Sequence, residues 1–406
     1  MRLLYLTPTS AMGGAERVLL DLITMVRSAR PDWRLGLVIG NEGPLAADVR
    51  QLGVATTVLP FPRDFARLGD AGLQSPGTWA RFVRHAVGGS VATARYARRL
   101  QSHVSAFDPD IVHTNGIKMH VLGALVKPTR ADLVWHFHDY PSSRPVTSRL
   151  VRSLRSRCSA VVAVSDSVAG DIREQVGAPV DVRTIWNSVD LSRFTPDGPQ
   201  VDLASLAGMP PQEPGIPTIG LVAAYARWKG HLLYLEALRR LSSTHRFRAY
   251  IVGGPLYETN GSQYSTEELR RAIDRLGLAD TVGLTGFIKD SPAALRSLDI
   301  VVHASTSPEP FGLVVAEAMA SGRTVLVSDA GGVAELVTPE VNALTYRGGD
   351  VDQMTAQLAR LLDDPGFRTV LGERARRSAA DQFNPARTCR QMVELYEGFG
   401  RAVRAA

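Results

Sequence analysis

Two glutamates with a fixed spacing are the strongest chemical feature of the sequence. Glu309 and Glu317 lie in SPEPFGLVVAEAMASG, residues 307–322, which directly follows an expected strand at Ile300–His303. Gly312 is expected to open a helix. Glu309 then falls in the loop between strand and helix, and Glu317 about one turn inside the helix.

The start of this helix is suited to bind oxygen-rich groups. The first N–H groups of a helix lack partners within it and carry partial positive charge, so the backbone at Phe311, Gly312 and Leu313 suits phosphate or sugar oxygens. The carboxylates of Glu309 and Glu317 can accept hydrogen bonds from paired hydroxyl groups, as in ribose or a hexose. The alternative is an exposed loop glutamate and a helix-surface glutamate that only offsets the helix dipole.

This segment and others along the chain resemble the retaining glycosyltransferases of family 4, which have the GT-B fold. Its core reads E-P-F-G-L-x-x-x-E-A-M-A-x-G, and further pieces follow in the family's order. They are GGAE (13–16), HFHD (136–139), VSDS (164–167), NSVDLSRFTP (187–196), WKG (228–230), VGGP (252–255), LTGF (284–287) and AGGVAE (330–335). The ordered set spans most of the chain.

Glycines at strand ends are expected to let a nucleotide approach the backbone. Gly13 and Gly14 follow the first strand and lack side chains that would keep a diphosphate away; the alternative is an ordinary tight turn. Gly253 is expected to let the nucleotide pass a strand end. Phe287 looks like the family position whose backbone lies near the base.

Two cations are expected to stabilise the leaving diphosphate, where negative charge develops. Lys229, in WKG, matches the family lysine directly. The family arginine follows a glycine five residues before that lysine, but Ala224 stands there. Arg227 is expected to substitute from a displaced position; the alternative is a solvated loop arginine.

A histidine at a strand end is the expected sugar contact. The family residue matching His138 contacts the donor sugar, and His136 is expected on the opposite face of the strand, in a structural role. No third ligand sits at a spacing that makes this pair a metal site. Asp108-Pro-Asp110 resembles a metal-binding D-x-D, but Asp and Pro before a strand are typical turn residues. The resemblance implies no cofactor and no metal.

Strands and helices alternate along the whole chain, which predicts two doubly wound α/β domains. A stretch with six Pro and three Gly at 196–217 is the clearest break in composition. We predict a Rossmann-like acceptor domain at 1–188, a Rossmann-like nucleotide-sugar domain at 189–384, and a last helix at 385–406 that returns to the first domain. The active site is expected in the cleft between the domains. The expected strands are Leu3–Thr7, Arg34–Ile39, Thr56–Leu59, Ile111–His113, Leu133–His138, Ala160–Val164, Val182–Ile185, Thr218–Val222, Arg248–Val252, Val282–Thr285, Ile300–His303 and Thr324–Ser328.

Composition narrows the class of protein. The chain has 406 residues, 45% of them hydrophobic and 21% charged, which is typical of globular proteins. Its apolar runs are too short for a transmembrane helix, and the N-terminal one is too short for a signal peptide. Two distant cysteines, Cys158 and Cys389, fit no disulfide framework, so the cytoplasm is the expected location.

Excess positive charge lies entirely in the first half. Residues 1–186 hold 23 Lys and Arg against 15 Asp and Glu, and the remainder holds 23 against 25. Residues 144–157 contain five Arg and no acid, as do residues 81–104, whose arginines alternate with apolar residues such as Tyr96 and Leu100. The second stretch predicts a basic amphipathic helix that binds an anionic membrane. The alternative is a solvated face whose apolar stripe packs in the domain core.

The expected reaction is therefore transfer of a sugar from a nucleotide-sugar to a hydroxyl acceptor, with retention. The resemblance places such reactions in the biosynthesis of polysaccharides, glycolipids or glycosylated metabolites, with an acceptor that can be lipid-linked. A nucleotide-sugar epimerase or hydrolase on the same plan would consume donor without an acceptor. A basic nucleic-acid-binding protein would explain the charge but leaves Glu309 and Glu317 unexplained, and no base-reading motif occurs, so no nucleic-acid partner is expected.

Overall fold

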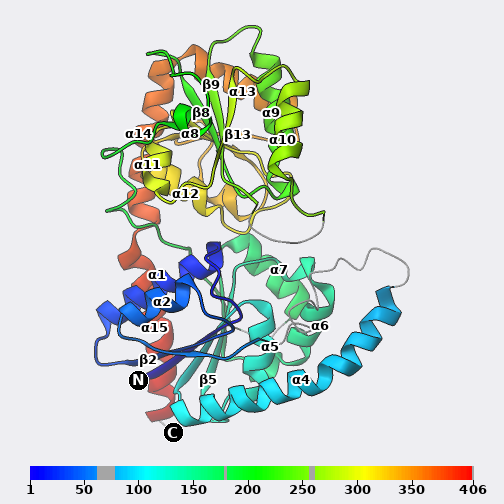
Figure 1. Cartoon of the computed structure of the whole chain (residues 1–406). Helices are drawn as coiled ribbons and strands as arrows, with labels where there is room; N and C mark the ends of the chain where they lie inside the picture. Colours follow the sequence, from blue (N-terminus) through cyan, green and yellow to red (C-terminus); the bar gives the residue numbers. More distant parts are fainter. Residues whose placement is uncertain (62–77, 178–180, 256–260, 405–406) are drawn as a thin grey trace. The chain divides into compact units, whose positions relative to one another are not determined.

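The computed structural model divides the chain into two compact units (Figure 1). Unit 1 comprises Met1–Ser188 with Ala386–Ala406, and unit 2 comprises Val189–Pro385. Residues 1–61, 78–177, 181–255 and 261–404 are described, with side chains described outside 78–91 and 400–404.

Among the described residues, unit 1 contains a parallel seven-stranded sheet in the order β3-β2-β1-β4-β5-β6-β7. The chain order reverses between β1 and β4, which is where a doubly wound sheet places its ligand crevice. The strands are β1 (Arg2–Thr7), β2 (Arg34–Ile39), β3 (Ala55–Val58), β4 (Ile111–Asn115), β5 (Asp132–Phe137), β6 (Ala160–Ala163) and β7 (Val182–Thr184).

Helices connect these strands, because parallel neighbours need a crossover. Buried leucine, isoleucine and valine at helical spacing fix the first of them against the sheet: Leu19, Leu22, Ile23 and Val26 line its inner face. The helices are α1 (Gly14–Ala29), α2 (Pro44–Gln51), α4 (Thr78–Phe107), α5 (Ile117–Val126), α6 (Pro145–Ser153) and α7 (Asp166–Val176), with short 3-10 turns η1 (Pro141–Ser143) and η2 (Arg155–Arg157).

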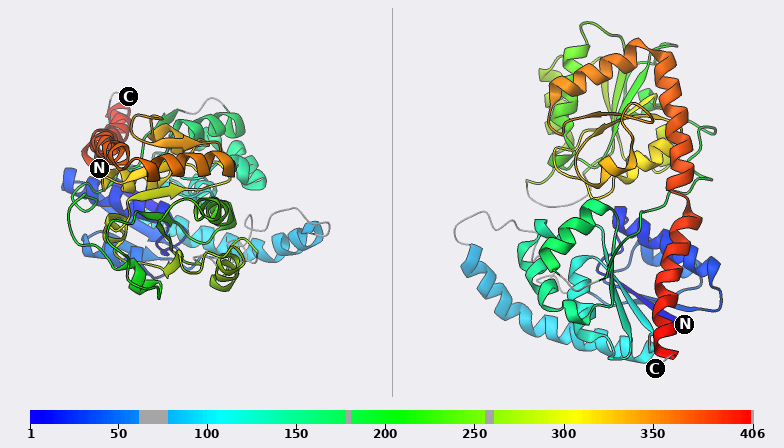
Figure 2. Two further views of the ribbon diagram at one scale, coloured as in Figure 1. Left: turned by 90° about the horizontal axis from the view of Figure 1, so that it is seen from above. Right: turned by 180° about the vertical axis from the view of Figure 1, so that it is seen from behind.

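The last helix, α15 (Pro385–Arg404), packs on unit 1 (Figure 2). Its Tyr396 is fully buried and its hydroxyl lies 2.9 Å from Nδ1 of His113 on β4. Glu397 accepts from the guanidinium of Arg30 at 2.8 Å. The C-terminal segment therefore completes the core of the first unit.

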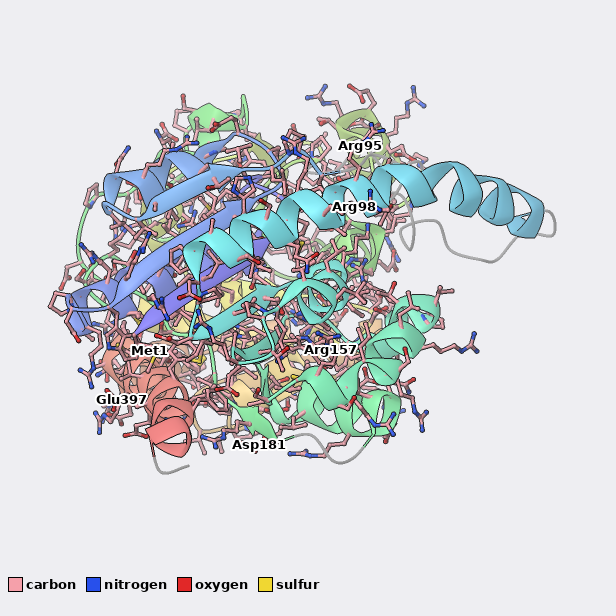
Figure 3. All side chains as sticks on the ribbon, turned by 90° about the horizontal axis from the view of Figure 1, so that it is seen from below. Met1, Arg95, Arg98, Arg157, Asp181 and Glu397 are labelled. Carbon is pink, nitrogen blue, oxygen red and sulfur yellow. The ribbon has the colours of Figure 1, made fainter. Side chains whose placement is uncertain are left out.

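The described half of α4 shows where the apolar side chains of this helix pack. Tyr96, Leu100 and Val104 are buried at four-residue spacing, whereas Arg95 and Arg98 are exposed on the same helix (Figure 3). The stripe therefore packs in the domain core over this part of the helix, and Tyr96 and Leu100 are not free to insert into a bilayer. The side chains of Arg81, Arg84 and the apolar residues between them and 91 lie outside the described residues.

Unit 2 repeats the architecture with six parallel strands in the part that the structure describes, in the order β10-β9-β8-β11-β12-β13. The strands are β8 (Thr218–Val222), β9 (Arg248–Val252), β10 (Val282–Gly286), β11 (Ile300–His303), β12 (Thr324–Ser328) and β13 (Leu344–Tyr346). The helical segments are α8 (Leu203–Leu206), η3 (Arg227–Lys229), α9 (His231–Leu241), α10 (Thr266–Arg275), α11 (Ser291–Arg296), α12 (Leu313–Ala320), η4 (Gly332–Leu336), α13 (Val351–Asp363) and α14 (Pro365–Gln382).

The expected α/β class is confirmed, although several strand bounds differ by one or two residues, and two differences matter more. The edge strand β13 was not expected from the sequence, because three residues with a polar centre carry too little periodicity. The strand expected at Leu133–His138 ends at Phe137, so His138 begins the following loop. Among the described residues, no helix combines the length and apolarity needed to cross a membrane.

Candidate active site

The strand order of unit 2 reverses between β8 and β11, and the loops that follow these two strands carry the WKG and SPEPFG segments. The ammonium Nζ of Lys229, after β8, lies 2.6 Å from Oε1 of Glu309, after β11. The side chains are only 19% and 13% exposed. A salt bridge thus spans the crevice position at which open α/β sheets bind their ligands.

Glycine at position 230 lets the WKG loop approach the end of β11. Gly230 has a φ of 73°, and a Cβ there would lie 1.8 Å from the carbonyl oxygen of Ala304. The N–H of Thr306 donates to the carbonyl of Trp228 at 2.8 Å, and the Trp228 ring lies 4.2 Å from Nζ of Lys229. This backbone hydrogen bond fixes the position of the WKG loop relative to the loop after β11, and so the position of the Lys229 ammonium.

Glu309 is a buried carboxylate with several partners, not an exposed loop side chain. Oε1 accepts from Lys229, and Oε2 lies 2.6 Å from Nε2 of His303 and 2.9 Å from the donating hydroxyl of Ser305. Burial alone raises the pKa of the Glu309 carboxyl, but the charges and hydrogen bonds of Lys229 and His303 more than offset this and hold that pKa well below its usual range. Glu309 is therefore ionised.

The helix after this loop begins where the sequence predicted. Gly312 is the N-cap of α12, with a φ of 88°, and a Cβ there would lie 2.4 Å from Cγ2 of Val333. Leu313 is the first helical residue, so its N–H and that of Gly312 belong to the end that carries partial positive charge. The ring of Phe311 is buried edge-to-face against Phe383, so the ring itself does not face a ligand.

Glu317 lies in the same helix, α12, and is 9% exposed. On the other side of the crevice, Gly253 has a φ of 143°, and a Cβ would lie 2.0 Å from the carbonyl oxygen of Ala223 after β8. Phe287, after β10, is 66% exposed and borders Gly254. The four segments that carry Lys229, Gly253, Phe287 and Glu309 thus meet at the carboxyl edge of one sheet.

Arg227 does not join Lys229 and Glu309 in this structure. Its guanidinium donates to Glu268 at 2.9 Å and to the carbonyl of Gly261 at 2.9 Å, and it lies 4.3 Å over the ring of Tyr264. Glu268 also closes the capping box at the start of α10. In this structure the Arg227 side chain is tied to α10, while Lys229 two residues later faces Glu309.

In unit 1, the predicted residues follow β1 and β5. Gly13 caps α1 and Gly14 opens it; a Cβ at Gly14 would meet no atom within 4 Å. The packing of the fold itself therefore does not require glycine at position 14. Nε2 of His138 lies 2.5 Å from Oδ1 of Asn115, and burial lowers the pKa of His138 to about 3, so its ring is neutral.

The expectation that His136 and His138 lie on opposite faces of the strand is wrong. The ring centroids of His136 and His138 lie 4.1 Å apart, because His138 has left the strand and no longer follows its alternation. His136 is buried, with ring contacts to His138 and His113.

The structure adds two residues that the sequence did not single out. His303 is the last residue of β11 and Ser305 follows it by two, and both contact Glu309. The sequence signal that could have identified them is the presence of two polar residues, His303 and Ser305, at the end of an apolar strand. Among the described residues, no group of three or more His, Cys, Asp or Glu side chains could hold a metal ion. Asp110, in the D-x-D segment, instead pairs with Arg2 at 3.0 Å.

Comparison with known families identifies the chain. Residues 12–193 match the family described as Glycosyltransferase Family 4, and residues 211–378 match that described as Glycosyl transferases group 1. Together the two matches take in most of both units. The chain belongs to glycosyltransferase family 4.

Curated relatives of this family-4 chain act on different acceptors. It is 29% identical to a D-inositol 3-phosphate glycosyltransferase of Salinispora arenicola over 71% of this chain and 64% of the relative. It is 34% identical to an MMP alpha-(1->4)-mannosyltransferase of Mycolicibacterium hassiacum over 44% of this chain and 42% of the relative. The match thus spans just under two thirds of the first relative's length.

Solved structures establish the fold. HepE of Anabaena, crystallised with UDP and glucose, has a TM-score of 0.79 and 24% identity over 98% of this chain and 99% of that one. A sucrose-phosphate synthase of Thermosynechococcus elongatus has a TM-score of 0.76 and 19% identity over 99% and 100%. The family-4 chain therefore has the expected GT-B fold.

Proposed function

We propose that the chain transfers a sugar from a nucleotide-sugar donor to a hydroxyl group of an acceptor, with retention of anomeric configuration and without a metal ion. The observation that carries the proposal is the Lys229–Glu309 salt bridge across the switch point of unit 2, beside the N-terminus of α12. HepE, a structural neighbour, was crystallised with UDP and glucose, which supports a nucleotide-sugar as the class of donor.

Departure of the nucleoside diphosphate is the step that these groups assist. The bond from the anomeric carbon to the phosphate oxygen breaks, and the diphosphate gains negative charge. The ammonium of Lys229 and the N-terminus of α12 at Gly312 stabilise that charge, and preformed groups need no reorganisation. Arg227 joins them only after it leaves Glu268, with which it pairs in this structure.

Family resemblance supports the remaining roles. Glu309 and His138 contact the sugar, and Glu317 holds the ribose. The acceptor oxygen attacks the anomeric carbon from the face that the diphosphate leaves, and the departing phosphate oxygen takes the acceptor's proton, which preserves the configuration. Because Nε2 of the neutral His138 ring donates to Oδ1 of Asn115, Nδ1 is left as an acceptor, which suits a hydroxyl group that donates.

The exposed ring of Phe287 extends the role that the resemblance assigns to its backbone. A flat aromatic face at the crevice edge offers a stacking surface to a nucleobase, and Gly254 beside it keeps the approach open. We therefore place the base near Phe287 and Gly253.

Calorimetric titration with UDP, GDP, ADP and dTDP tests the donor proposal. We expect one of these nucleotides to bind and Glu317→Ala to weaken that binding by about tenfold or more, because a charge-assisted hydrogen bond to the ribose is lost. The matched control is Asp274→Ala, which removes an exposed carboxylate on α10. Equal binding by the Glu317 and Asp274 variants would remove Glu317 from the site. Donor consumption that needs no acceptor would favour the epimerase or hydrolase.

We also propose that unit 1 rests on an anionic membrane at the cytoplasmic face, which suits a lipid-linked acceptor. Helices α4, α5 and α6 pack side by side in unit 1. Their outer surface carries the exposed arginines Arg95, Arg98 and Arg149 together with the exposed Leu125 and Leu150. Clustered arginines attract anionic lipid headgroups, and exposed leucines beside them can enter the interface.

Flotation with vesicles tests the membrane proposal. We expect the chain to float with phosphatidylglycerol vesicles and not with phosphatidylcholine vesicles, and salt to reverse binding. Arg95→Gln with Arg98→Gln should weaken partition by about thirtyfold, at about 1 kcal/mol per arginine. Arg270→Gln with Arg271→Gln, exposed on α10 of unit 2, is the charge-matched control. Equal flotation of the two double variants would place the membrane contact elsewhere.

A further inference from the structure

A cavity lies at the edge of the unit 2 sheet opposite the candidate active site. It has a volume of about 500 Å³ and is lined by residues from the amino ends of strands, including Thr324, the first residue of β12, and Asp299, which precedes β11. Lys229 and Glu309 follow the carboxyl ends of the strands. The cavity is therefore separate from the group that we assign to the donor.

Arginines dominate the lining of this cavity. Three of them, Arg323, Arg368 and Arg376, donate hydrogen bonds from Nη1 to main-chain carbonyl groups. The acceptors lie at Leu298 for Arg323 (3.3 Å), Leu361 for Arg368 (2.7 Å), and Phe194 (2.9 Å) and Ala320 (2.6 Å) for Arg376. These contacts anchor the guanidinium groups and restrict their rotamers, so a ligand need not order them.

Nearby carboxylates balance these cations only in part, since Asp299 and Asp197 act on Arg323 through space without an ion pair. Among the described residues, no carboxylate lies within ion-pair distance of Arg323, Arg368 or Arg376. The lining holds a fourth arginine, Arg377, with its neighbour Glu373 at 3.9 Å, and Asp299, whose Oδ2 accepts from the N–H of Thr218 at 2.7 Å. The lining itself holds four cations and two anions, an excess of two positive charges.

We propose that this cavity binds the phosphate group of a small phosphorylated metabolite. Guanidinium groups match phosphate oxygens with paired N–H donors, and anchored arginines keep this geometry. The volume is that of a pocket for a whole small molecule, larger than a lone phosphate needs. Asp299 and the hydroxyl of Thr369 in the lining suit a phosphate carried on a polyol or sugar, whose hydroxyl groups they can bind.

A ligand in this cavity would contact the C-terminal end of α12, the helix whose N-terminal end belongs to the proposed donor site. Arg376 donates to Ala320, the last residue of α12, and Gly322 just beyond that helix lines the cavity. Gly312 caps the opposite end of the same helix. Since the two sites share α12 but no side chain, each can be removed by substitution without the other.

Calorimetric titration of the full chain with glycerol 3-phosphate, and with glycerol as the neutral control, tests the proposal. We expect glycerol 3-phosphate alone to bind, and Arg368→Gln with Arg377→Gln to weaken binding at least tenfold. Arg374→Gln removes an exposed arginine on the same helix, α14, that does not line the cavity, and it should bind as the unaltered chain does. Lys229→Ala should also retain this binding.

Three results would overturn the proposal. The first is absence of binding at millimolar glycerol 3-phosphate. The second is equal binding by the double variant and Arg374→Gln. The third is loss of binding in Lys229→Ala alone, which would place the phosphate at the donor site. If the double variant unfolds, the single Arg377→Gln replaces it, since that side chain is exposed and its removal should still weaken binding measurably.

Discussion

Replacing Lys229 by alanine is expected to slow sugar transfer by about a hundredfold or more, the typical effect of removing one preorganised group that meets charge developing in a transition state. The ammonium of Lys229 is held 2.6 Å from Glu309 and is largely shielded from water, so solvent cannot take its place. Once the nucleotide titration has named the donor, release of the nucleoside diphosphate measures the rate. Lys289→Ala, an exposed lysine of the same unit, is the control.

This substitution also leaves Glu309 buried without its ammonium partner. Breaking such a pair costs about 3 kcal/mol of folding free energy or more, so lost activity and lost stability have to be separated. The double variant Lys229→Ala with Glu309→Gln removes both charges, and we expect it to recover part of the thermal stability but none of the activity. Transfer at the normal rate in either Lys229 variant would show that this ammonium does not act on the leaving group.

The expected strands in unit 2 show why much of the fold could be predicted. Ile300–His303 and Thr324–Ser328 match β11 and β12 residue for residue, because strands buried on two faces are short apolar runs between turn residues. The same rule fails at β13, Leu344–Tyr346, which is short and has a polar centre. Its position at the sheet edge comes from tertiary packing.

Only part of the candidate site could be named from the sequence, since His303 and Ser305 beside Glu309 were missed, and its contacts could not be predicted. Lys229 and Glu309 each stand out from their motifs, yet their pairing depends on β8 and β11 being neighbours, which is a property of topology. Arg227 is in the right motif, but its partner Glu268 lies 41 residues away on α10. Sequence spacing contains no information on such a competing partner.

The second large effect is a loss of stability of unit 1 in mild acid. Burial lowers the pKa of four histidines of unit 1, namely His113, His120, His136 and His138, to about 3 for His113 and His138. In the unfolded chain these groups titrate near pH 6.5. Below that pH the unfolded chain binds protons that the folded chain cannot accept, so stability is fully present above about pH 6.5 and decreases as the pH falls toward the folded pKa. Four such groups contribute a slope of up to about 5 kcal/mol per pH unit.

Urea unfolding at pH 7.5, 6.5 and 5.5 measures this slope, and the fluorescence of the buried Trp33 and Trp135 reports on unit 1. His136→Leu should be nearly neutral at pH 7.5, because neither ring nitrogen of His136 has a hydrogen-bond partner among the described residues, and it should reduce the slope by about one proton. His103→Gln, an exposed histidine on α4, should leave the slope unchanged. Since an unfolded histidine is mostly protonated at pH 5.5, an equal slope in the His136 and His103 variants would mean that His136 is also protonated in the folded chain, which contradicts a histidine held neutral by burial.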